Sequence, residues 1–145
     1  MHALQDGTRW MLRLDDGEDV FDTLSRFAEA NGIRAAAIAF GIGMFRRATV
    51  GYWDGSQYRT HELAVPHEVV GLHGTIARAD DRPSVHLHVA LAGPDHRIVG
   101  GHLMNATVGV LQEILLETFP GHTFGRPMVE TFGLRMLDLE PGAHP

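Results

Sequence analysis

The stretch VHLHVALAGPDHRIVGGHL, residues 85–103, places three histidines around one turn. Successive side chains of a strand point to opposite faces, so the aliphatic residues of VHLHVAL share one face, while His86 and His88 share the other. Residues 93–96, GPDH, are typical of a type I turn, with proline at its second position and, at the fourth, a histidine that tolerates a left-handed backbone. The sequence therefore predicts a β-hairpin centred on this turn.

The register of this hairpin determines where the third histidine lies. A three-residue loop pairs Gly93 with Arg97, and counting outward from that pair places His88 opposite His102. Directly opposed residues carry their side chains on one face, with Cβ atoms about 4.5–5.5 Å apart. We therefore expect His86, His88 and His102 to converge closely enough to bind one metal ion.

The three imidazoles form a candidate metal site. The chain has no cysteine, so a transition-metal site must use imidazole and carboxylate ligands. Three neutral histidines leave a fourth position open on zinc, as in catalytic zinc sites, whereas two or more open positions suit iron, manganese or nickel. We expect a divalent metal ion, with zinc favoured; the alternative is a solvated strand face in a histidine-rich chain. His73 is a further candidate, as a fourth ligand or as a hydrogen-bonding neighbour of the site.

The composition limits the class of protein. The 145 residues suit one domain, 1–145, with a core from about residue 8 to 140, and no stretch approaches the length of a membrane span. The formal charge of -6 and the absence of lysine disfavour nucleic acid as a partner. We expect a cytoplasmic protein that does not contact a membrane. Residues 1–7 and 140–145 are expected to be frayed.

Periodicity predicts one helix followed mainly by strands. Apolar residues recur at helical spacing in residues 17–32, where acids gather in the first turn and Asn31-Gly32 supplies the stop. Residues 107–119, TVGVLQEILLETF, suit either a helix or a buried strand. The predicted strands comprise residues 10–14, 33–40, 48–53, 57–63, 68–77 and 133–140, of which the last is expected to close the sheet.

From about residue 19 to 139 the chain resembles the PPC (plants and prokaryotes conserved) domain family, also called DUF296. The resemblance is tightest at residues 68–77, EVVGLHGTIA, and 86–103, HLHVALAGPDHRIVGGHL. It implies an α+β fold with a largely antiparallel sheet, a homotrimer, and a strand for residues 107–119. The fold and the histidine pattern are more loosely similar to acetolactate decarboxylase, a zinc lyase.

The family resemblance carries a DNA-binding label that this chain does not support. In plant members the domain follows an AT-hook, a segment that binds the minor groove. The positions of His86, His88 and His102 are typically serine or glycine in those plant proteins, whereas prokaryotic members resemble this chain. The GRP of residues 125–127 lacks the basic flanks of an AT-hook, and we interpret it as a turn. DNA binding by this chain alone is therefore the weakest function hypothesis.

Two function hypotheses start from the metal site. In the first, the chain is a metal-binding domain that binds or senses a small ligand. In the alternative, it is a metal-dependent lyase or hydrolase in which Glu113 is the acid or base, since a glutamate inside the apolar run VLQEILL is costly unless it is paired or functional. Arg46, Arg47 and Arg97 are candidates for holding a carboxylate.

We expect walls around the metal site, because a bare hairpin face offers little concavity. The glycines of residues 41–45, GIGMF, allow close backbone approach. The sequence therefore predicts a cleft near this segment, with a subunit boundary as one location for it. Glu113 is expected to lie closer to the metal than Glu62 or Glu130.

Overall fold

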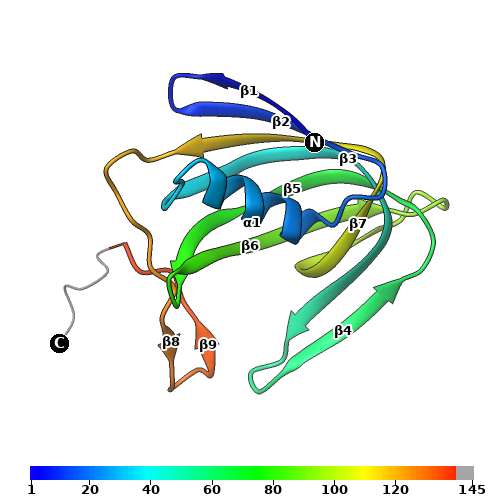
Figure 1. Cartoon of the computed structure of the whole chain (residues 1–145). Coiled ribbons are helices and arrows are strands. Elements are labelled where there is room, and N and C mark those ends of the chain that lie inside the picture. The colour runs from blue at the N-terminus through cyan, green and yellow to red at the C-terminus, as the bar shows by residue number, and fades with distance from the viewer. Residues whose placement is uncertain (140–145) are drawn as a thin grey trace.

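The computed structural model describes residues 1–139 and shows one helix lying against a curved antiparallel sheet (Figure 1). Helix α1 (Val20–Ala30) follows the second strand, and two short strands, β8 (Met128–Val129) and β9 (Leu134–Arg135), form a separate sheet. The main sheet consists of β1 (His2–Asp6), β2 (Arg9–Asp15), β3 (Ala36–Trp53), β4 (Tyr58–Leu63), β5 (His67–Ala79), β6 (Arg82–Ala92) and β7 (Ile98–Thr118). The predicted α+β class is confirmed.

The main sheet has the order β1-β2-β7-β6-β5-β3-β4, with an additional pairing between β7 and β3. This extra pairing closes β3, β5, β6 and β7 into a ring. The two longest strands, β3 and β7, form it together, and their register shifts at four points between Ile38 and Val50. Such bulges bend a strand and increase its twist, which lets both strands turn from one side of the sheet to the other.

Helix α1 begins and ends where its sequence signals predict. The Asp19 carboxylate accepts a hydrogen bond from the Asp22 backbone N–H at 2.8 Å, and Gly32 adopts a φ of +62° just beyond the helix. The buried side of α1 covers one face of the sheet in Figure 1. Phe27 meets Trp10 of β2 edge-on, with ring centroids 5.1 Å apart. The core therefore lies between this helix and the sheet.

The predicted hairpin is confirmed in its turn and in its register. The Gly93 N–H donates to the Arg97 carbonyl at 3.1 Å, and His96 takes a left-handed φ of +61°. His88 lies opposite His102. Leu87 and Leu91 are fully buried on the core side of β6, so the histidines are left on the other side. Residues 107–119, which periodicity left open, are strand through Thr118, as the family resemblance implied.

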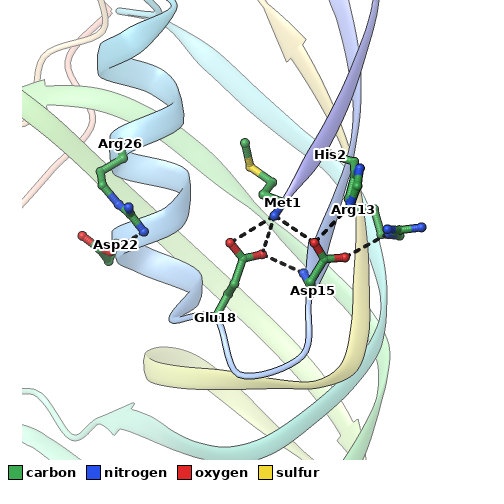
Figure 2. A network of polar contacts seen from close by, with 7 residues as sticks. All are labelled: Met1, His2, Arg13, Asp15, Glu18, Asp22 and Arg26. Atoms are coloured by element: carbon green, nitrogen blue, oxygen red, sulfur yellow. Dashed lines mark hydrogen bonds and ion pairs between the residues drawn. The ribbon is translucent and has the colours of Figure 1, made fainter.

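The N-terminal segment is not frayed, contrary to our expectation. Residues 2–6 form β1, which pairs along β2. The Met1 amino group lies 2.9 Å from an Asp15 carboxylate oxygen and 3.2 Å from Glu18, and Figure 2 shows Asp15 at the end of β2 and Glu18 in the turn that leads into α1. These contacts were missed because alternation is weak over so short a strand. The other segment expected to be frayed, 140–145, lies outside the described residues.

Three predicted strands differ from the observed ones. Residues 33–40 and 48–53 were expected to be separated at Gly41 and Gly43, but β3 is continuous through both. These glycines mark close approach, because a Cβ at Gly43 would lie 2.3 Å from the Leu111 carbonyl oxygen of β7. Residues 133–140 do not close the sheet. Within the described residues, β9 pairs only with β8, and both lie below the sheet in the view of Figure 1.

No helix within residues 1–139 is long and apolar enough to cross a membrane.

Candidate metal centre

The candidate site lies where β6 and β7 pair on the side of the sheet away from α1. His86 and His88 project from β6, and His102 projects from β7. Gly101 brings β7 close to β3: its φ is +148°, and a Cβ there would lie 2.7 Å from the Gly51 carbonyl oxygen. The glycine before His102 therefore allows the backbone conformation that places this histidine beside the other two.

The three imidazoles converge as the sequence predicts. Their ring centroids lie 4.9–5.3 Å apart, and one ring nitrogen from each residue falls within 4.8 Å of the others. The Nε2 atom of His86 is 3.2 Å from the Nδ1 atom of His102. Two ligands on a tetrahedral zinc ion with bonds of about 2.0–2.1 Å have nitrogens about 3.3 Å apart. The separation of this pair therefore fits a shared metal ion, and the donor set suits zinc.

The environment favours the neutral form of the imidazoles, which is the form that binds metals. Burial, followed by the positive charge of Arg126, lowers the pKa of His86 to about 4. Burial, followed by His88 and Arg126, also lowers the pKa of His102. These two imidazoles therefore stay uncharged at neutral pH, each with one ring N–H.

Arg126 sets the hydrogen bonding of His86. Its Nη1 atom lies 3.2 Å from His86 Nδ1, and a guanidinium can only donate, so this ring nitrogen is the acceptor. The His86 proton then resides on Nε2, which donates to His102 Nδ1 in the metal-free protein. If His86 held a metal ion through Nε2, the imidazole proton would have to move to Nδ1, and the Arg126 contact at that nitrogen would have to change.

The histidines line a pocket of about 570 Å³. One wall is the tip of the β3–β4 hairpin, where Trp53 meets Tyr58 edge-on and the Tyr58 ring tilts over His102 with centroids 4.9 Å apart. The opposite wall comes from Arg126 and the β8–β9 segment, including Phe132. The two hairpins therefore enclose the part of β6 and β7 that carries the imidazoles.

The predicted wall at residues 41–45 is wrong for a single chain, because none of these residues lines the histidine pocket. They lie further along the ring, where Gly41 pairs with Ile114 and Ile42 pairs with Glu113. The physical reason is the continuous β3 strand, whose distal end at Trp53, and not its glycine segment, reaches His102.

Glu113 is not brought to the histidines within one chain. It pairs with Arg13 of β2 and lines a different pocket, together with His2, Leu4 and Met11. The three arginines considered as carboxylate-binding candidates also lie outside the histidine pocket. Arg46 contacts Asp16 at 2.6 Å, and Arg97 lies 3.6 Å from Asp95, while Arg47 is exposed on β3.

His73 lies beside His88 in the sheet register but outside the group of converging nitrogens. Its Nδ1 atom is 3.0 Å from the Ala39 carbonyl oxygen, so the backbone of β3 already provides it with a partner. His73 and His88 line a small second pocket on the far side of the His88 ring. This placement makes His73 a neighbour of the site and does not make it a fourth converging ligand.

Sequence reasoning missed Arg126, Trp53 and Tyr58. The aromatic residues were seen only as strand residues, and Arg126 was part of the predicted turn at 125–127. One signal for Arg126 was present: no acidic residue lies within three positions of it on either side. An arginine with no local acid, set among apolar residues, indicates a distant partner or a ligand.

Known proteins share this fold over nearly the whole chain. A plant- and prokaryote-conserved (PPC) protein from Pyrococcus horikoshii is 28% identical, with a TM-score of 0.84 and coverage of 91% of this chain and 92% of that one. A metal-containing protein from Archaeoglobus fulgidus is 35% identical, also with a TM-score of 0.84, over 92% and 95% of the two chains.

The chain also matches part of a longer protein. It is 29% identical over 133 residues to the bifunctional protein GlmU of Synechococcus sp. (strain JA-2-3B'a(2-13)), a match that covers 91% of this chain and 20% of GlmU. The chain thus spans about a fifth of the length of the curated relatives it matches. A sequence profile of the Plants and Prokaryotes Conserved (PCC) domain matches residues 1–120, and the chain belongs to this family.

Proposed function

We propose that this chain is a metal-binding PCC domain that holds one divalent ion through ring nitrogens of His86, His88 and His102 and binds or senses a small ligand beside it. The observation that carries the proposal is the convergence of three imidazoles that line one pocket. The A. fulgidus relative, described as metal-containing, adds support. Zinc is the favoured ion because the donors are all imidazole and the pocket leaves a coordination position for a ligand.

The composition of the pocket favours ligand binding over metal-dependent catalysis by a carboxylate acid or base. None of the described residues that line it carries a carboxylate. A lyase or hydrolase would need a proton-transfer group within hydrogen-bond reach of its substrate. In the enzymatic alternative, Glu113 could supply that group only from a second subunit, since in its own chain it lines another pocket.

Metal analysis of purified protein tests the site. We expect wild-type protein dialysed against zinc to retain one equivalent, and His88→Ala to lose it. His61→Ala is the matched control, because His61 is exposed on β4 and away from the pocket. Full zinc content in both His86→Ala and His102→Ala would exclude the site.

A homotrimer is the second part of the proposal. Ile42 and Val110 are 46% and 69% exposed on neighbouring strands, and apolar side chains of this kind gain by association. Light scattering at micromolar concentration should give three times the chain mass, whereas a monomeric mass contradicts the trimer. If a second subunit brings Glu113 to the pocket, Glu113→Gln should leave metal content unchanged and abolish any turnover.

A further inference from the structure

Arg126 is a buried cation without an anionic partner among the described residues. Its side chain is only 6% exposed, and no carboxylate among residues 1–139 forms an ion pair with it. Its Nη2 atom donates to the Thr75 hydroxyl at 2.6 Å, and its Nε atom is buried without any hydrogen-bond partner. The third nitrogen, Nη1, meets the neutral ring of His86.

The other arginines near the pocket are arranged differently. Arg135 lines the same pocket, but its guanidinium contacts the Asp80 carboxylate at 2.5 Å and donates to the Arg126 carbonyl at 3.1 Å. Arg78 contacts Glu29 at 2.6 Å. Arg126 alone of these three therefore has a charge that nothing in the described chain offsets.

An uncompensated buried charge is costly, and proteins keep one where a ligand supplies the opposite charge. Burial lowers the pKa of the Arg126 guanidinium, yet arginine stays charged in proteins. A bound metal ion would add further positive charge within the same pocket. Both cations therefore favour a negatively charged ligand.

The pocket walls indicate what kind of anion fits. One buried guanidinium with a planar fork matches a carboxylate, which accepts two parallel hydrogen bonds. Phosphate groups are commonly held by helix N-termini, and α1 lies on the opposite face of the sheet. Trp53 and Phe132 offer flat apolar surface on either side of the histidines.

We propose that the pocket binds a small organic acid, with its carboxylate held by Arg126 and its apolar body between Trp53 and Phe132, next to the three histidines. This deepens the proposed function by naming the ligand class, and it rests on the same pocket. When the ligand binds, hydrogen bonds from the guanidinium replace the water around its carboxylate. The negative charge of the ligand then offsets the positive charge of Arg126.

Titration calorimetry with benzoate and benzamide tests the charge requirement, because the two probes have nearly the same shape and differ in charge. The protein is measured after dialysis against EDTA and again after loading with zinc. We expect benzoate to bind at least about tenfold more tightly than benzamide in both forms, since a charge-assisted pair replaces a neutral contact. Equal binding of the two probes, or tighter binding of inorganic phosphate than of benzoate, overturns the proposal.

The variant Arg126→Gln should remove the preference for benzoate over benzamide, because glutamine carries no charge. Arg97→Gln is the matched control, because it deletes an arginine that is 87% exposed on the β6–β7 turn. Unchanged benzoate preference in Arg126→Gln overturns the proposal. If this variant does not fold, a crystal structure of wild-type protein with bound benzoate tests the proposal instead. A benzoate carboxylate beyond hydrogen-bond distance of Arg126 would overturn it.

The two metal states separate this proposal from the proposed function. Benzoate binding that depends on Arg126 in protein that cannot hold zinc would support the organic-acid site and remove the metal function. If the protein binds zinc but its benzoate affinity is the same in Arg126→Gln, the metal function is preserved and the organic-acid site is overturned.

Discussion

The two faces of β6 contrast within a few residues. On one face, Leu87 and Leu91 are fully buried beneath α1 and form part of a continuous apolar core. On the other, His86 and His88 face a pocket whose wall contains Arg126, a buried arginine without an acidic partner among residues 1–139. The strand backbone is the same, so the difference lies in the side chains of each face and in what covers them.

The comparison separates stability from function. The core face is buried within one chain, because Leu87 and Leu91 belong to a single cluster of buried apolar side chains. On the pocket face, burial lowers the pKa of His86, and no carboxylate among residues 1–139 pairs with the Arg126 guanidinium, so we propose that a ligand completes this face. Substitutions on the core face should therefore change the free energy of unfolding, and those on the pocket face should change binding.

The largest expected effect is on the core face. Leu87→Ala should lower the free energy of unfolding by about 2–5 kcal/mol, because it removes a fully buried side chain and leaves a cavity. Urea denaturation of metal-free protein measures this loss. His88→Ala, one position away on the exposed face, should change the same quantity by less than about 0.5 kcal/mol. Similar losses in both variants would contradict the division between the faces.

The sequence predicted the contrast on β6 because both of its causes are local. Strand parity assigns alternate residues to opposite faces, and the Gly-Pro-Asp-His turn fixes the pairing of His88 with His102. Helix α1 was equally predictable from its cap and its spacing.

The walls of the pocket were not predictable by these means. Trp53 and Arg126 reach the histidines only through the closed ring of strands and the separate β8–β9 sheet, which depend on contacts between distant segments. The position of Glu113 was misjudged for the same reason. Glu113 is close to His102 in the sequence, but both lie on the long strand β7. Glu113 therefore lies far along this strand from His102, where β7 pairs with β2.

Zinc removal should have the next largest effect on the free energy of unfolding. This effect should depend on residues of the pocket face alone. A ligand present at about 100 times its dissociation constant stabilises a protein by about 2.7 kcal/mol. Wild-type protein should lose about this much stability when EDTA removes zinc, as measured by urea denaturation. His88→Ala should show no difference with and without zinc, whereas Leu87→Ala should keep the full zinc effect. A zinc effect that survives in His88→Ala would place the ion elsewhere.

The Asp16 carboxylate lies outside the pocket and has partners in the chain, which gives a pH prediction that Arg126 should not share. The Asp16 carboxylate accepts from the Val110 N–H at 3.0 Å and meets Arg46 at 2.6 Å. The Val110 N–H, followed by Arg46, lowers the pKa of Asp16 from its usual 3.8. The ionised form is therefore favoured by folding. Its contribution to stability is present above pH 3.8 and is lost as the pH falls through the lower folded value.

Asp16→Asn isolates this charge, because asparagine can still accept a hydrogen bond from Val110. We expect wild-type protein to be more stable than the variant at neutral pH, by less than the zinc effect, and the difference to shrink below pH 3.8. Urea denaturation of metal-free protein at several pH values measures the difference. A difference that grows as the pH falls would reverse the assigned sign.

The smallest effect is expected from Tyr58→Phe, which asks whether the aromatic wall acts on His102 through its hydroxyl or through its ring. The Tyr58 hydroxyl lies 3.4 Å from His102 Nδ1, a long contact, and the same nitrogen lies 3.2 Å from His86. Phenylalanine retains the tilted ring contact at 4.9 Å and removes only the hydroxyl. Zinc affinity, measured by competition with a chelating dye, should therefore change by less than about threefold, whereas groups that orient a metal ligand typically account for about 10–100-fold. Tyr58→Ala, which also removes the ring, should weaken zinc binding more than Tyr58→Phe does. A loss of about tenfold or more in Tyr58→Phe would instead make the hydroxyl the group that orients His102, and the β3–β4 hairpin would then act directly on the metal centre and not only as a wall of the pocket.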